Sequence, residues 1–125
     1  MAQDAFGRPI PDAPASPVSV EPEVRDIADV PAVEVINTVA VHLLSAAAVQ
    51  CGLAEDDPRV DLDEARKLID SLAGLVTAAA PHLGDHHARA LRDGLRSVQL
   101  AFREASPVPD PIGKGPGEKY TGPVN

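Results

Sequence analysis

The chain has 125 residues, a formal net charge of −8 and one cysteine. At this length we expect a single domain, and the lone Cys51 excludes an internal disulfide. The acidic balance argues against DNA as a partner, because a duplex repels a protein of the same charge. No cofactor is expected, since the sequence carries no cofactor-binding motif.

The first 30 residues are rich in proline and acidic residues and contain one aromatic side chain, Phe6. Such a segment buries too little apolar surface to offset its chain entropy, so residues 1–30 are predicted to form a disordered acidic leader. Residues 1–11 show neither a basic segment nor an apolar segment of a secretory signal. A cytoplasmic location is therefore expected.

A strongly apolar helix is predicted over residues 31–52, because Pro31 suits the first helical position and Gly52 suits the stop. Its polar residues fall into one stripe at helical spacing: Glu34, Thr38, His42 and Ser45. They interrupt the apolar residues too often for a helix that spans a membrane, so no membrane partner is expected. The remaining apolar arc is wider than a single packed face requires.

This wide arc predicts that the first helix is covered on two sides. A core of about 75 residues is marginal, and a second covered face would add several kcal/mol at about 25 cal/mol per Å². We therefore expect a homodimer with the first helix at its interface. The interface residues predicted are Val35, Ile36, Val39, Leu43 and Leu44.

Two further helices are predicted from heptad spacing, over residues 62–80 and 86–106. Their apolar seams are Leu62, Ala65, Ile69, Leu72, Val76 and Ala79, then Ala88, Leu91, Leu95, Val98, Phe102 and Ala105. Asp61 and Glu64 form a capping box, Pro81 is expected to end the first of these helices, and Asp85 to cap the second. The sequence thus predicts an all-α, three-helix unit over residues 31–106, made of a helical hairpin and the apolar first helix.

Proline and glycine return in residues 107–125, which are predicted to form a flexible tail without regular structure. Within the tail, residues 115–124 contain the only tyrosine of the chain. One hypothesis is a partner-docking motif with Tyr120 as the anchor and Lys119 beside it, because a rigid aromatic ring gives contact area at low entropic cost. A plain flexible tail is the alternative.

The third helix carries a row of basic residues on one face: Arg89, Arg92, Arg96 and Arg103, with Gln99 in the gap. Forked guanidinium groups could bind phosphates, an RNA backbone or an acidic protein surface. The alternative is a solvated helix face with weak ion pairs. These four arginines, with Lys119 and Tyr120, are the predicted partner-binding residues.

A polar cluster surrounds the predicted turn before the third helix: His82, Asp85, His86 and His87. A catalytic zinc site needs three ligands and a structural site needs four, and the turn breaks the shared face of these residues. We interpret them as turn residues and expect neither a metal nor a catalytic residue. Cys51 lacks an activating base and is predicted to be a buried, reduced thiol.

Three segments carry a resemblance to a known family: Asp-Leu-Asp-Glu-Ala-Arg-Lys-Leu-Ile-Asp at 61–70, Leu-Arg-Asp-Gly-Leu-Arg at 91–96 and Gly-Pro-Gly-Glu-Lys-Tyr at 115–120. Together they resemble an actinobacterial branch of the bacterial domain-of-unknown-function family 1844, over about residues 33–124. The resemblance implies no activity. Genes of this family often neighbour genes for translation factors and ribosomal proteins, which implies a ribosome-linked partner as one possibility.

The sequence as a whole favours a non-enzymatic helical interaction or adaptor protein that forms a homodimer. One alternative is an RNA- or ribosome-associated factor that uses the arginine row. A metal-dependent enzyme that uses His82, Asp85 and His86 is a more distant alternative.

Overall fold

The computed structural model describes residues 26–56 and 59–125. Its regular elements are η2 (Ile27–Asp29), α1 (Ala32–Gln50), α2 (Leu62–Leu83), α3 (Asp85–Ala105) and α4 (Glu118–Thr121). The all-α prediction is confirmed for this part of the chain. The predicted disordered leader falls mostly on residues 1–25, which lie outside the described residues.

The chain divides into two compact units between Ala32 and Val33. In the first part, the Asp26 carboxylate caps η2 and accepts the backbone N–H of Ala28 at 2.9 Å. This side-chain cap satisfies an amide that the short helix leaves without a partner.

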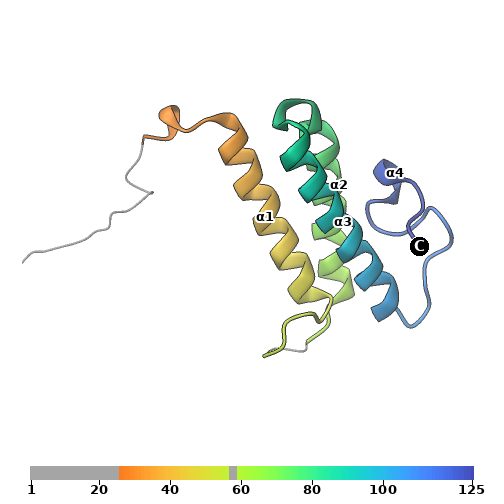
Figure 1. Cartoon of the computed structure of the whole chain (residues 1–125). Helices are drawn as coiled ribbons and strands as arrows, with labels where there is room; N and C mark the ends of the chain where they lie inside the picture. The colour runs from red at the N-terminus through yellow and green to blue at the C-terminus, as the bar shows by residue number, and fades with distance from the viewer. Residues whose placement is uncertain (1–25, 57–58) are drawn as a thin grey trace, which may run out of the picture. The chain divides into compact units, whose positions relative to one another are not determined.

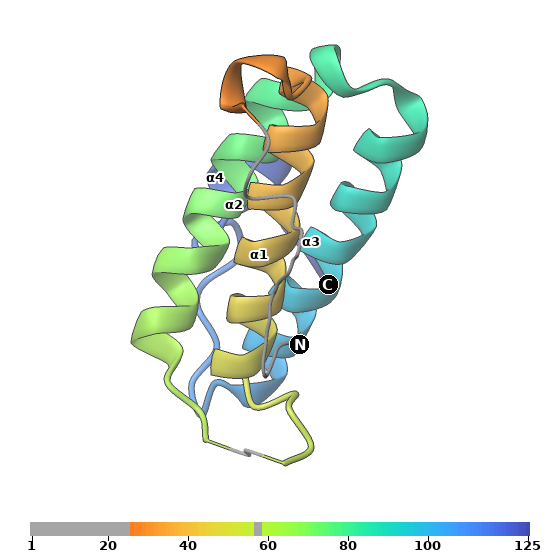
Figure 2. The ribbon, with the colours of Figure 1, turned by 90° about the vertical axis from the view of Figure 1, so that its left-hand side faces the viewer.

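In the second part, α2 and α3 form the predicted antiparallel hairpin (Figures 1 and 2). The heptad positions form the core, and the buried ones are Ala65, Ile69, Leu72, Val76, Ala79, Ala88, Leu91, Leu95, Val98 and Phe102. Leu62 and Ala105, at the ends of the seams, are half-buried. The heptad prediction is confirmed, because residues three and four apart lie on one face of a helix.

The turn of the hairpin differs from the prediction. Asp61 caps α2 as expected and accepts the Glu64 N–H at 3.1 Å, but α2 continues through Pro81 to Leu83. Proline removes one hydrogen bond in the last turn, and the buried Leu83, 4% exposed, extends the core and compensates for that loss. Gly84, with φ of +79°, then joins the helices alone, so Asp85 is a helical residue rather than the cap.

The limits of α1 follow the prediction. The helix begins directly after Pro31 and ends two residues before Gly52, which has φ of +88°. By length and composition α1 could cross a membrane, and only 11% of it is buried.

A narrow stripe of small residues fixes α1 to the hairpin. Ala40 and Ala47 are fully buried, and Cys51 beyond the helix is 5% exposed. On α3, a Cβ added at Gly94 would lie 2.6 Å from a methyl group of Leu44. The absence of a side chain at Gly94 therefore lets Leu44 pack onto the α3 backbone.

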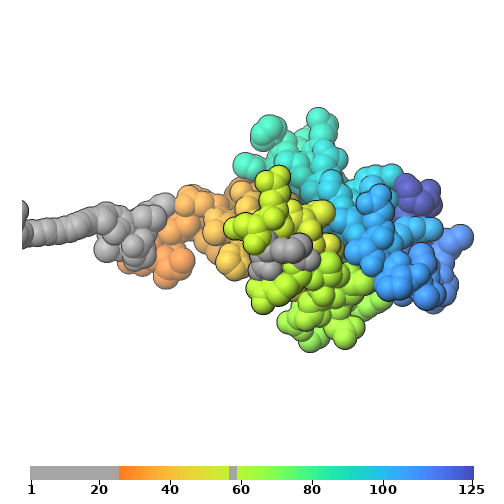
Figure 3. Space-filling model, turned by 90° about the horizontal axis from the view of Figure 1, so that it is seen from below, coloured from red at the N-terminus to blue at the C-terminus, as the bar shows by residue number. Residues whose placement is uncertain are grey.

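The hairpin is the middle layer of this part of the structure. One face is covered by α1, and the other face is covered by the C-terminal residues that include α4 (Figures 1 and 2). The space-filling view shows the C-terminal residues in blue, on the side of the hairpin away from α1 (Figure 3). The two coverings therefore lie on different sides of α2 and α3.

Candidate functional site

Residues 113–125, which we name the C-terminal segment, pack against the hairpin. Pro116 and Gly117 are buried, and Val124 is 6% exposed. The sequence predicted a flexible tail with no regular element, whereas the structure shows α4 and a series of hydrogen bonds to α2 and α3. The predicted absence of regular structure is thus wrong at Glu118–Thr121, because tertiary contacts stabilise a short helix that has little stability alone.

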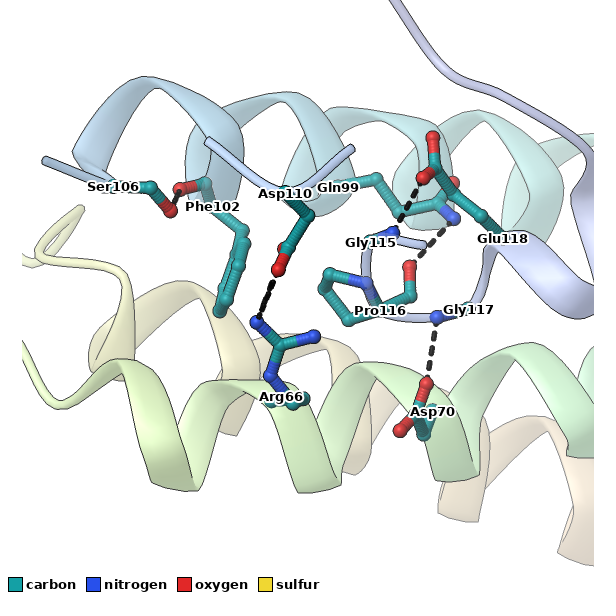
Figure 4. A network of polar contacts seen from close by, with 10 residues as sticks. All are labelled: Arg66, Asp70, Gln99, Phe102, Ser106, Asp110, Gly115, Pro116, Gly117 and Glu118. Atoms are coloured by element: carbon teal, nitrogen blue, oxygen red, sulfur yellow. Dashed lines mark hydrogen bonds and ion pairs between the residues drawn. The ribbon is translucent and has the colours of Figure 1, made fainter. Parts of the chain in front are cut away.

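Side chains from both helices of the hairpin bind adjacent backbone groups of the segment (Figure 4). From α2, Asp70 Oδ1 accepts the N–H of Gly117 at 2.7 Å. From α3, Gln99 Nε2 donates to the carbonyl oxygen of Pro116 at 3.0 Å and to Thr121 Oγ1 at 3.1 Å. Gln99 is 5% exposed, so these bonds satisfy a polar group that would be costly to bury alone. The two side chains fix the register of the segment on the hairpin.

Gly117 lies in close contact with both helices of the hairpin. Its φ of +76° is left-handed, a conformation that side chains with a Cβ disfavour. A Cβ at this position would also lie 2.9 Å from Gln99 Nε2 and 3.0 Å from the Ala73 Cβ. Both the backbone conformation and the available space therefore require glycine.

The Glu118 carboxylate links the two ends of the segment. Its Oε1 accepts the N–H of Gly115 and its Oε2 accepts the N–H of Val124, both at 2.6 Å. Hydrogen bonds to a charged acceptor are stronger than neutral ones. Glu118 therefore closes residues 115–124 into a compact loop around α4.

An ion pair holds the connection between α3 and the segment. Arg66 Nη2 lies 3.0 Å from both carboxylate oxygens of Asp110, and the guanidinium carbon lies 5.0 Å from the centre of the Phe102 ring (Figure 4). Two apolar side chains of the connection, Val108 and Ile112, are 84% and 78% exposed. Arg66 thus joins α2 to residues 106–112 through Asp110.

The arginine row of α3 faces the C-terminal segment. Arg96 Nη2 donates to the carbonyl oxygen of Asn125 at 2.9 Å, and Arg103 Nη1 donates to that of Val124 at 3.3 Å. Arg89 and Arg92 are exposed and make no hydrogen bond or ion pair within the described residues. The row thus has two parts, of which one binds the chain's own backbone and the other is free for a ligand.

The predicted anchor Tyr120 contacts the hairpin of its own chain. A Cβ at Gly74 would lie 3.3 Å from the ring Cζ and Oη atoms, so the ring packs on α2 where a side chain is missing. Lys119 Nζ lies 5.1 Å from the centre of this ring. Tyr120 is nevertheless 44% exposed, which leaves part of its surface for another contact.

The residues predicted as a dimer interface do not all lie on one surface. Val35 and Val39 are 37% and 47% exposed, while Ile36 and Leu43 are half-buried beside them. Leu44 lies on the other side of α1, against α3, and is already used within the chain. The wide apolar arc therefore serves both the hairpin and an uncovered side, because Ile36, Leu43 and Leu44 pack against the core while Val35 and Val39 are exposed.

The polar turn shows no metal-binding geometry. His82, Asp85, His86 and His87 are all exposed, and the rings of His86 and His87 meet edge to face with centroids 5.7 Å apart. Over residues 26–56 and 59–125, no group of three His, Cys, Asp or Glu side chains could hold a metal ion.

Cys51 is buried and free, as predicted. Its Sγ lies 4.0 Å from the carbonyl oxygen of Val98. Burial raises the pKa of this thiol above its ordinary value, because the thiolate loses hydration. A protonated, enclosed thiol suits a packing role between α1 and α3.

Sequence reasoning missed three residues that hold the C-terminal segment. Asp70 and Glu118 were given no role, and Gln99 was placed on a surface row rather than in a buried bond network. The signal that could have revealed them is the Gly-Pro-Gly-Glu sequence at 115–118, since a glycine flanked by a rigid proline and an acidic residue is typical of a tight, side-chain-bound turn.

The fold and the docked segment together define a small all-α protein whose C-terminal residues cover one face of its own helical hairpin. The chain belongs to the family described as Domain of unknown function (DUF1844), which it matches over residues 32–104. The match spans α1, α2 and nearly all of α3, and it ends before the C-terminal segment. A comparison with curated proteins and one with solved structures each found no match.

Proposed function

We propose that this protein is a non-enzymatic helical interaction protein that forms a homodimer through one side of α1. The surface involved, which we name the α1 stripe, consists of Val35, Ile36, Val39, Leu43 and Ala46. Ile36, Val39, Leu43 and Ala46 follow steps of three and four, the spacing of packed helices, and Val35 lies four residues before Val39. The observation that carries the proposal is the exposure of Val35 and Val39, at 37% and 47%, on the most apolar helix of the chain.

The apolar area left uncovered contributes favourably to association with a second copy. Full burial of a valine side chain contributes about 1.5 to 3 kcal/mol, so covering the exposed part of Val35 and Val39 on two chains contributes about 4 kcal/mol. The half-buried Ile36, Leu43 and Ala46 add to this value. An antiparallel pair of α1 helices would also place the two Glu34 carboxylates at opposite ends, without repulsion between them.

A second copy suits this surface better than a membrane does. Helices that lie on membranes carry Lys and Arg on their polar face, whereas residues 32–50 contain neither, and the whole chain has a net charge of −8. The complete burial of Ala40 and Ala47 and the packing of Leu44 on Gly94 also tie α1 to the rest of the protein. These contacts favour an exposed helix face within a folded protein.

The non-enzymatic part of the proposal rests on how the polar groups are used. Asp70, Gln99 and Glu118 are bonded to backbone groups of the C-terminal segment, so none of them is available as an acid or a base. Catalysis by side chains requires a group within reach of a substrate and an activating neighbour.

Sedimentation velocity over a range of protein concentrations tests the proposal. We expect the wild-type chain to shift from monomer to dimer, and Val39→Glu to remain monomeric because it places a charge in the α1 stripe. Val41→Glu is the matched control, since Val41 is 45% exposed but lies outside the stripe. A wild-type monomer at every concentration would overturn the proposal, and so would disruption by Val41→Glu alone. Flotation with lipid vesicles would instead indicate a membrane surface.

A further inference from the structure

A hollow of about 390 Å³ lies between α2, α3 and the C-terminal segment, on the opposite face of the hairpin from α1. Its polar lining includes Arg92 and Arg96 from α3, Thr77 from α2 and Tyr120 from α4. Known small-molecule sites have volumes of roughly 300 to 1,000 Å³, so the hollow has the size of a small-ligand site.

The charge of the hollow is opposite to that of the chain. Arg92 makes no hydrogen bond or ion pair within the described residues, and Arg96 uses one Nη2 contact to the Asn125 carbonyl oxygen. No Asp or Glu side chain lines the hollow. A local positive site in a protein with a net charge of −8 attracts an anion selectively to this position.

The geometry of the two arginines fits a phosphate group. Arg92 and Arg96 are four residues apart, so they lie on the same face of α3. Planar guanidinium groups donate paired hydrogen bonds to phosphate oxygens, and the Thr77 and Tyr120 hydroxyls can add neutral donors. These donors come from three helices, α2, α3 and α4, so they surround the hollow on more than one side.

The remaining wall is apolar. Val76 and Leu95 from the hairpin and Pro123 from the C-terminal segment line the hollow beside the arginines. A ligand with a phosphate at one end and an organic group at the other would satisfy both parts of the lining. We propose that the hollow binds a small phosphomonoester, with its phosphate on Arg92 and Arg96 and its organic part against Pro123 and the ring of Tyr120. This site is independent of the α1 stripe.

Isothermal titration calorimetry of the full chain with adenosine monophosphate and with inorganic phosphate tests this site. We expect adenosine monophosphate to bind more tightly than inorganic phosphate, and Arg92→Gln to weaken its binding about tenfold or more, the loss typical of a charge-assisted bond. Arg89→Gln is the matched control, because Arg89 shares the face of α3 but does not line the hollow. It should bind as the wild type does.

Three results would overturn the proposal. They are the absence of heat with both probes at millimolar concentration, equal losses in Arg92→Gln and Arg89→Gln, and tight binding of an RNA oligonucleotide that depends on Arg89 as much as on Arg92. The last result would assign the row to a nucleic-acid backbone. Arg92 is exposed, so Arg92→Gln should fold normally, and its circular dichroism spectrum checks this.

Discussion

Replacing Gly117 with alanine should detach the C-terminal segment without unfolding the hairpin. A left-handed residue with a Cβ costs about 1 to 2 kcal/mol. The new Cβ would also meet Gln99 Nε2 at 2.9 Å and the Ala73 Cβ at 3.0 Å, so the segment must move away and weaken the charged bond to Asp70. A bond of that type is worth about 1.5 to 3 kcal/mol, and we expect Gly117→Ala to destabilise docking by about 3 kcal/mol in total.

Hydrogen exchange measured by mass spectrometry on the full chain gives a direct test. A loss of about 3 kcal/mol corresponds to roughly 100-fold faster exchange of the amides in residues 117–122. Gly113→Ala is the control, because Gly113 has a similar φ of +82° but no atom within 4 Å of its added Cβ. It should cost only the backbone contribution of about 1 to 2 kcal/mol. Equal effects of the two variants would refute the reasoning from the close contacts of Gly117.

Two other predictions concern Glu118 and Cys51. Glu118→Gln replaces an acceptor of two backbone N–H groups by an amide that can accept with one oxygen only, so docking of the C-terminal segment should weaken by about 2 kcal/mol. The fluorescence anisotropy of Tyr120, the sole tyrosine in a chain without tryptophan, should then fall, whereas the exposed control Glu104→Gln should leave it unchanged. Burial raises the pKa of the Cys51 thiol above 9.0, so the thiol ionises first in the unfolded chain and the free energy of unfolding falls as pH rises past about 9. Urea denaturation at pH 8 and pH 10 should show a smaller fall in this free energy for Cys51→Ala than for the wild type. Identical falls would contradict Cys51 as the cause.

The hairpin could be predicted because it depends on residue spacing within each helix. Heptad spacing in each helix places Ile69, Leu72, Leu91 and Leu95 on one face whatever lies around them, and burial of that face then follows. The prediction that α2 ends before Pro81 was wrong, because the true end depends on the packing of Leu83 in the core that α2 shares with α3. Local propensity favoured a stop, and tertiary burial outweighed it.

The docked segment could not be predicted from local pattern. Its contacts join residues far apart in the chain, such as Gly117 with Asp70, 47 positions away, and Pro116 with Gln99. Glycine and proline have the same composition signature in a flexible tail and in a tightly bound turn. Only the partner side chains distinguish the two cases, and spacing does not identify them.

The prediction for α1 was only partly specific, because it did not say which residues face the hairpin. Its apolar arc indicated two covered sides, and the structure assigns Ala40, Ala47 and Leu44 to the side that faces the hairpin. The other side, with Val35 and Val39, is exposed in a single chain. Hydrophobicity alone could not divide the arc between these two surfaces, because both are built from the same residue types.

In the proposed homodimer, the α1 stripe of one chain contacts the α1 stripe of a second copy. An isotope-filtered NMR experiment on an equal mixture of ¹³C-labelled and unlabelled full-length protein tests it most directly. We expect intermolecular nuclear Overhauser effects from the methyl groups of Val39 and Leu43 to α1 protons of the unlabelled chain. A dimer whose intermolecular signals arise elsewhere, or a sample without any such signals at millimolar concentration, would contradict it.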